Sequence, residues 1–305
     1  MSERGEATRE LDECLSMASF YSDGLHFNYA TRGPGPSTFF FQHGIGGTHT
    51  QPLRFLDPFG DDGSSINKLR GSIQLLRFAA FDFRAHGRTP VGDPEKLRFD
   101  AFADDLAAFM DYLEVEKAVL GGISMGAAVA LNAALHYPER CIALVLSRPA
   151  WLDGSMSATA IAAYTEAVKY LKEEPSPERA LQKLEDSDVY REVAKQSADA
   201  GKSLLGQVRC VVSDPSIREA ALARLHYLPS GQPGVDLKSA AAVNVPTLVL
   251  ATPDDPMHPL SYARSVAATI PGASYVELAP KQLNDGPHIQ EVNTHLVKFL
   301  DSVLA

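Results

Sequence analysis

Residues 118–130 constrain the fold of this chain more than any other segment. They begin as an apolar run, continue as Gly-Ile-Ser-Met-Gly and end in an alanine-rich pattern typical of a helix. This order predicts a strand, a sharp turn and a helix, with Ser124 at the apex of the turn. Gly122 and Gly126 flank the serine, and residues without a side chain are needed where a strand and a helix pass so closely. We therefore expect the Ser124 hydroxyl beside a helix N-terminus, which favours developing negative charge.

Strand and helix patterns alternate along most of the chain. The predicted strands cover residues 38–41, 73–83, 115–123, 141–147, 246–251 and 273–278. A final helix is expected over residues 289–304. This alternation predicts an α/β fold, a mostly parallel, doubly wound sheet with helices on both faces.

The alternation stops between residues 151 and 242, a stretch rich in Ala, Glu, Lys and Leu with no convincing strand. We predict that this stretch is a helical lid, or cap, inserted into a core made of residues 1–150 and 243–305. Residues 1–18 are polar and are expected to form an N-terminal arm.

Charge and composition exclude several classes of partner. The formal net charge of −10 argues against nucleic acid or an anionic membrane as a main partner. The first ten residues are charged and lack a secretory signal, and no apolar run approaches the roughly 18 residues that span a bilayer. The cysteines are odd in number, form no C-x-x-C pair and are expected to be free thiols in a reducing cytoplasm: Cys14, Cys141 and Cys210.

No cofactor or metal is expected. His, Cys and Asp residues show no metal-ligand spacing. The three glycines between residues 44 and 47 are not followed by the lysine and serine of a phosphate loop. We expect a cytoplasmic protein with a small-molecule substrate, and the sequence leaves a homodimer open.

Five motifs together resemble the α/β-hydrolase family over nearly the whole chain. They are His43-Gly44, the segments 84–88, 122–126 and 252–259, and Gly286-Pro287-His288. The resemblance implies the family's core fold with a lid after the sixth core strand. It also implies a catalytic serine, acid and histidine in that chain order.

A serine hydroxyl is a poor nucleophile until a base takes its proton. Histidine suits this task because its ordinary pKa lies near 6.5. We select His288, expected in a loop just before the final helix, as the base for Ser124. His258 lies three residues after Asp255 on the same loop, and we expect it to line the pocket or support the acid.

A carboxylate must hold the imidazole in one tautomer and stabilise its charge. Asp255 is the preferred acid because it lies three residues after Thr252, which occupies a position where the family usually has glycine. That departure leaves Asp254 open as an alternative, and Asp153, after the preceding strand, as a third.

The oxyanion formed during acyl transfer needs preorganised N–H donors. Met125 supplies one by the geometry of the turn. Ile45 is expected to supply the other, with Gly44 as an alternative. Gly44 and Trp151 are predicted to contact substrate, although packing beneath the lid remains an alternative for Trp151.

These features predict a serine hydrolase that cleaves a small, mostly apolar ester or lactone through an acyl-enzyme intermediate. An alternative is hydrolysis of a carbon–carbon bond in a vinylogous diketone, because some relatives perform that reaction with the same triad. A third hypothesis is a non-catalytic protein of the same fold that binds a small ligand, since fold alone does not determine function.

Overall fold

The computed structural model describes residues 18–56, 76–281 and 285–304. Almost all of the predicted N-terminal arm, including Cys14, therefore lies outside the described residues. Cys141 and Cys210 are free thiols.

One eight-stranded sheet forms the centre of the molecule, with the strands in the order β1-β2-β4-β3-β5-β6-β7-β8. In chain order the strands are Ala18–Ser22, Leu25–Arg32, Ser37–Gln42, Leu76–Phe81, Ala118–Ile123, Cys141–Ser147, Thr247–Ala251 and Ser274–Glu277. β1, β2 and β4 pair antiparallel, and every pairing from β4 to β8 is parallel. The predicted α/β class with a mostly parallel sheet is confirmed.

The helices are α2 (Thr50–Leu53), α3 (Phe99–Tyr112), α4 (Met125–His136), α5 (Ala158–Glu173), α6 (Pro177–Glu185), α7 (Asp188–Gln196), α8 (Ala198–Ser213), α9 (Arg218–Tyr227), α10 (Leu260–Thr269) and α11 (Gly286–Leu304). Short 3-10 helices cover Pro94–Lys96, Pro138–Arg140, Pro215–Ile217 and Ser239–Ala242.

Helices cover both faces of the sheet, as the alternation predicts. α3, α4 and α10 share one hydrophobic core with the sheet, whereas α11 and the segment around α2 pack in a second core on the other face. Strand β3 shows why its apolar run is continuous: Phe40 enters the first core, and Phe39 and Phe41 enter the second. A parallel strand covered on both sides requires apolar residues at consecutive positions.

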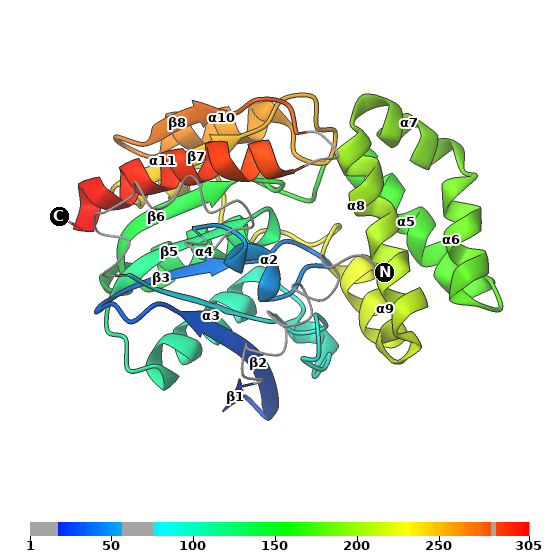
Figure 1. Ribbon diagram of the computed structural model, residues 1–305, viewed down its shortest axis with the longest axis horizontal. Coiled ribbons are helices and arrows are strands. Elements are labelled where there is room, and N and C mark those ends of the chain that lie inside the picture. The colour runs from blue at the N-terminus through cyan, green and yellow to red at the C-terminus, as the bar shows by residue number, and fades with distance from the viewer. Residues whose placement is uncertain (1–17, 57–75, 282–284, 305) are drawn as a thin grey trace, which may run out of the picture.

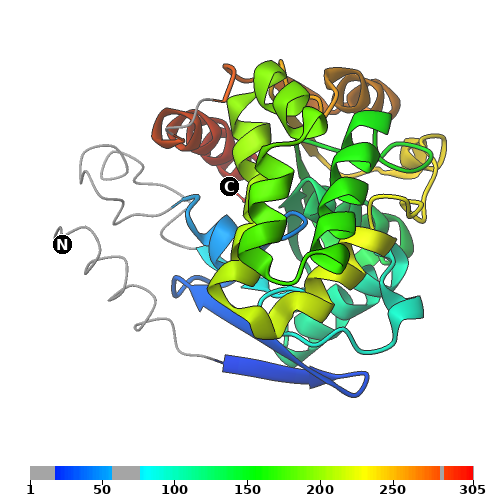
Figure 2. The ribbon, with the colours of Figure 1, turned by 90° about the vertical axis from the view of Figure 1, so that its right-hand side faces the viewer.

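Helices α5 to α9, which we call the helical insertion, lie between β6 and β7 in the sequence. Figure 1 shows them together at one end of the sheet, and Figure 2 looks directly onto them. Four of these helices begin with a serine whose hydroxyl accepts a backbone N–H: Ser157 for α5, Ser176 for α6, Ser187 for α7 and Ser197 for α8. Such caps satisfy N–H groups that have no acceptor within the helix.

Candidate functional site

The turn after β5 has the geometry that its glycines predict. Ser124 has φ of 56° and ψ of −107°, a conformation that residues with a side chain rarely adopt, and α4 begins at the next residue. A side-chain carbon at Gly122 would overlap the backbone of Gly126, and one at Gly126 would overlap the backbone of Gln42. The backbone N–H of Ser124 donates to the carbonyl of Ser147 at 2.8 Å, which ties the turn to β6.

His258 lies between Ser124 and Asp255. Its Nε2 is 2.9 Å from the Ser124 Oγ, and its Nδ1 is 2.9 Å from the Asp255 Oδ2. The other carboxylate oxygen of Asp255 accepts the backbone N–H of Met257 at 3.0 Å. Ser124 is 5% exposed and Asp255 8% exposed, so this arrangement is shielded from water.

The structure reverses the placement of the two histidines that the sequence analysis expected. His288 lies in the first turn of α11, which begins at Gly286 rather than at residue 289, and not in a loop. Its ring is buried, and its Nδ1 has no hydrogen-bond partner among the described residues. Burial, Arg148 and Lys281 together lower the pKa of His288 to about 4.

The reason for this reversal is local. The backbone N–H of His258 donates to the carbonyl of Asp255 at 3.2 Å, so the loop after β7 makes a turn there. Side chains three residues apart lie side by side in such a turn. Both histidines follow Asp255 in the chain, so the order serine, acid, histidine fits either one. The spacing in Asp-Pro-Met-His was the signal that could have identified His258.

The three candidate acids lie in different surroundings. Asp255 contacts the imidazole of His258. Asp254 is exposed, and Asp153 is exposed and accepts the backbone N–H of Leu237. Burial alone would raise the pKa of Asp255, but His258 and Arg148 outweigh it and hold that pKa well below its usual range.

The pKa of His258 is lowered from its ordinary value. Burial is the largest cause and Arg148 adds to it, while the neighbouring Asp255 acts in the opposite direction. The imidazole is therefore neutral near pH 7, the state in which it can accept a proton.

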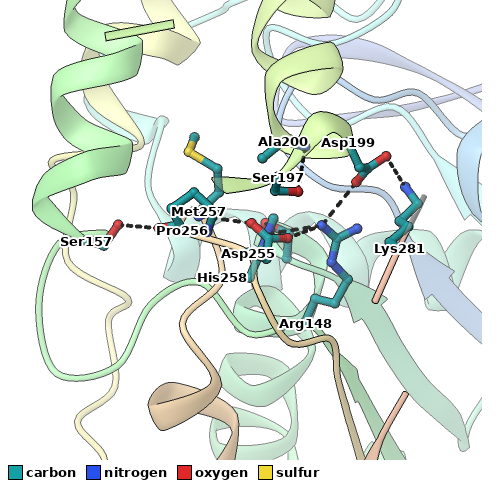
Figure 3. A network of polar contacts seen from close by, with 11 residues as sticks. Arg148, Ser157, Ser197, Asp199, Ala200, Asp255, Pro256, Met257, His258 and Lys281 are labelled. Atoms are coloured by element: carbon teal, nitrogen blue, oxygen red, sulfur yellow. Dashed lines mark hydrogen bonds and ion pairs between the residues drawn. The ribbon is translucent and has the colours of Figure 1, made fainter. Parts of the chain in front are cut away.

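Asp255 also belongs to a network of buried charges that the sequence analysis did not foresee (Figure 3). Arg148, directly after β6, forms an ion pair with the Asp255 Oδ2, and its Nη2 lies 3.5 Å from the Oδ2 of Asp199. Lys281, after β8, lies 2.9 Å from the Oδ1 of Asp199. No sequence motif marks these contacts, because their partners are far apart in the chain.

The loop after β3 lies against Ser124. A side-chain carbon at Gly44 would be 3.3 Å from the Cβ of Ser124. The Gly44 N–H already donates to the Gln51 side chain at 2.8 Å, so Ile45 is the remaining candidate of the two that the sequence analysis named in that loop. Met125 is the first residue of α4, where a backbone N–H has no acceptor within the helix.

Gln207 of α8 lies over this loop. Its Nε2 donates to the carbonyl of Ile45 at 3.2 Å, and its side chain packs against Gly46. The helical insertion therefore contacts the same loop that borders the serine.

Trp151 is buried at the start of the segment that leads into the insertion. Its ring packs edge-on against Phe99, with centroids 4.9 Å apart. It also lines a small cavity with Ala127, Ala128 and Pro233, and that lining does not include Ser124, Asp255 or His258. These contacts fit the packing alternative for Trp151.

His43 and His86 are fully buried behind the loop after β3. The Nε2 of His43 accepts the Phe83 N–H at 3.1 Å, and its Nδ1 lies 2.8 Å from the Gly44 carbonyl oxygen. The Nδ1 of His86 lies 2.9 Å from the carbonyl oxygen of Arg84. Burial lowers the pKa of His43 to about 4. His43 thus joins the loops after β3 and β4, and His86 binds a backbone group within the loop after β4.

Within the described ranges, no group of three or more His, Cys, Asp or Glu residues could hold a metal ion. No helix in that part of the chain is long and apolar enough to cross a membrane.

Comparison with known proteins identifies the family. A family model described as the α/β-hydrolase fold matches residues 37–289. The chain belongs to the α/β-hydrolase family. Two solved structures resemble it over 93% of its length: the enol-lactonase of Burkholderia xenovorans LB400 (TM-score 0.68, 18% identity, 99% of that chain) and a meta-cleavage product hydrolase of Pseudomonas fluorescens IP01 (TM-score 0.69, 19% identity, 97% of that chain).

Curated relatives match shorter parts of this α/β-hydrolase. The 2-hydroxy-6-oxononadienedioate/2-hydroxy-6-oxononatrienedioate hydrolase of Comamonas testosteroni is 30% identical over 171 residues, which is 56% of this chain and 58% of that protein. Three other curated relatives are matched over 34%, 49% and 29% of their own length, so the chain spans less than half of each of them.

Proposed function

We propose that this α/β-hydrolase is a serine hydrolase in which Ser124 is the nucleophile, His258 the general base and Asp255 the acid that orients it. The observation that carries the proposal is the pair of contacts, both 2.9 Å, that join the serine oxygen, the imidazole and the carboxylate. Nucleophile, base and orienting acid within hydrogen-bond reach are the requirements for an activated serine.

The reaction follows from these positions. The Oγ of Ser124 attacks the carbonyl carbon, its proton passes to the Nε2 of His258, and the backbone N–H groups of Met125 and Ile45 bind the oxyanion. Collapse of the tetrahedral intermediate breaks the bond to the leaving oxygen, which takes the proton from His258. Water then attacks the acyl enzyme by the same route and releases the acid.

We propose a small, mostly apolar ester or lactone as the substrate. Ile45 and Met125, beside the serine, belong to a hydrophobic cluster that continues into the insertion, which supports this substrate class. Fold similarity to an enol-lactonase is compatible with it.

Carbon–carbon bond hydrolysis is a second candidate. Its support is the curated relative from Comamonas testosteroni, whose name describes hydrolysis of an oxo-dienedioate. A panel of esters, lactones and vinylogous diketones would separate the two reactions. A non-catalytic binding protein would instead bind one of these compounds without turnover.

The decisive test is the intact mass of the protein after exposure to a fluorophosphonate. A bond forms between the Ser124 oxygen and phosphorus, the phosphorus–fluorine bond breaks, and the serine proton passes to the base. We expect one adduct on the native chain and none on Ser124→Ala.

Two histidine variants make this test specific. We expect His258→Ala to slow labelling by about 10⁴-fold or more, as loss of a triad base does. His288→Gln is the matched control and should label within about tenfold of the native rate, because the hydrogen bond to the Ser124 Oγ comes from His258. If His288→Gln abolished labelling and His258→Ala did not, the assignment of the base would be wrong.

A further inference from the structure

Arg148 is a residue that a serine, histidine and aspartate do not by themselves require. Its φ is 52°, in the left-handed region that favours glycine, and its side chain is 10% exposed. Its Nη2 contacts the Oδ2 of Asp255, the same oxygen that lies 2.9 Å from His258 Nδ1. Backbone strain and a buried cation both cost free energy, so they point to a role for this side chain.

The helical insertion supplies the second carboxylate that Arg148 needs. Asp199 is the second residue of α8. Its Oδ2 lies 3.5 Å from Arg148 Nη2, and its Oδ1 lies 2.9 Å from Lys281 Nζ. Figure 3 shows these groups in one continuous network. Two buried carboxylates thus face two cations, and one of the carboxylates comes from the insertion.

Arg148 and His258 compete for the charge of Asp255. When His258 takes the serine proton, the resulting imidazolium is stabilised by Asp255. An arginine that had Asp255 as its sole counter-ion would draw that carboxylate away from the imidazole, because attraction between buried charges is weakly screened.

We propose that Asp199 is a positioning residue for the active site. By pairing with both Arg148 and Lys281, it balances part of the positive charge that Arg148 would otherwise direct at Asp255 alone, so proton transfer at the serine depends on the docking of α8 against the core. This inference rests on the proposed function, because it assigns a role through His258.

Several elements place ionisable groups around His258 and Asp255. Arg148 after β6, Tyr164 on α5 and Asp199 on α8 act on those two residues directly. Lys281 after β8 and His288 on α11 face Arg148 and Asp199, and Asp285 faces Lys281 and His288. Asp199 raises the pKa of His258 and Arg148 lowers it. Removing one or the other should therefore move the acidic limb of the activity profile in opposite directions.

The test is the rate of fluorophosphonate labelling of Ser124 as a function of pH. Asp199→Asn removes the charge and keeps the shape. We expect labelling at pH 7 to slow by about tenfold, and the acidic limb to move to lower pH by about 0.5 to 1 unit. The matched control is Asp188→Asn on α7, whose carboxylate is 99% exposed and pairs with Arg191. This control should leave both the rate and the limb unchanged.

Two further variants separate positioning from simple structural damage. Asp199→Glu keeps the charge and should restore most of the rate and the position of the limb. Arg148→Gln should move the limb to higher pH, and in the double variant the further effect of Asp199→Asn should largely disappear, because its target is absent. Loss of folded protein alone would lower the amplitude of labelling without moving the limb.

The outcomes distinguish this inference from the proposed function. If the native chain is not labelled by a probe that labels another serine hydrolase, the proposed function fails. A second outcome is that the native chain is labelled, but the acidic limb of Asp199→Asn lies at the same pH as that of Asp188→Asn or at higher pH. The role of Asp199 is then refuted and the proposed function stands.

Discussion

The serine turn and the helical insertion meet at the same site but are held in place by different forces. The turn is fixed by backbone contacts: Gly122 and Gly126 let strand and helix touch, and the Ser124 N–H binds a carbonyl of β6. The insertion is fixed on the core largely through side chains, among them Asp199 on Arg148 and Gln207 on the Ile45 carbonyl. The nucleophile is thus positioned by backbone contacts within and beside the turn, whereas the insertion that covers it depends on side chains, both polar pairs and a hydrophobic cluster shared with the core.

The largest effect is expected from adding a methyl group to the turn, which tests whether its backbone contacts are rigid. Gly126→Ala would push a side-chain carbon into the backbone of β3 and the following residue, His43. We expect a loss of about 3 kcal/mol or more in the free energy of unfolding, because neither backbone can yield cheaply. Urea denaturation followed by circular dichroism measures it. A variant as stable as the native chain would show that the turn is not rigid.

Acid should destabilise the folded chain through histidines that are buried in their neutral form. The pKa of His288 is lowered to about 4 in the folded state, against 6.5 for the ordinary side chain. The unfolded chain therefore binds more protons below pH 6.5, so stability is complete above that pH and falls as pH decreases toward 4. We expect His288→Gln to reduce this fall by about 1–2 kcal/mol, after allowance for partial exposure.

Denaturation curves between about pH 4 and 7 check the prediction for His288. His43, whose pKa is also lowered to about 4, should still contribute its share of the fall in the variant. An unchanged pH dependence in His288→Gln would mean that this histidine does not titrate with unfolding.

The contact of Gln207 tests how tightly the helical insertion is held against the core. Among the described residues its Nε2 makes one hydrogen bond and its buried Oε1 has no partner, so truncation to alanine should change stability little. We expect Gln207→Ala to speed labelling by a bulky fluorophosphonate by about threefold to tenfold, because space opens beside the loop at Ile45.

The control for this variant is Gln196→Ala, on the exposed end of α7. It removes the same side chain away from the site and should leave labelling unchanged. Slower labelling of Gln207→Ala, with Gln196→Ala unaffected, would instead indicate that Gln207 supports the oxyanion loop.

The smallest effect is expected at Gly206, a glycine of the insertion that, unlike those of the serine turn, has space around it. Gly206 lies within α8, and a side-chain carbon there meets nothing within 4 Å. Because alanine restricts the unfolded chain and favours helix, Gly206→Ala should stabilise the protein by about 0.5–1 kcal/mol. A thermal unfolding midpoint below that of the native chain would contradict it.

Features that depend on residues close in the chain could be predicted from the sequence alone. The spacing of Gly122 and Gly126 predicts the turn at Ser124, because the steric limits act within five residues. Apolar runs predict the buried parallel strands, since each strand must be covered on both faces. The helical insertion is predicted because the residues after Trp151 are rich in Ala, Glu, Lys and Leu and show no strand pattern, which is also a local property of the chain.

Which side chains surround the serine depends on contacts between distant parts of the chain. Chain order allows both His258 and His288 to follow Asp255, and the choice depends on a turn after β7 and on where α11 begins. The contacts of Arg148 with Asp199 and Lys281 join three elements that are distant in sequence. Such contacts depend on distances in space, which follow from how the sheet and the insertion pack and not from any local pattern.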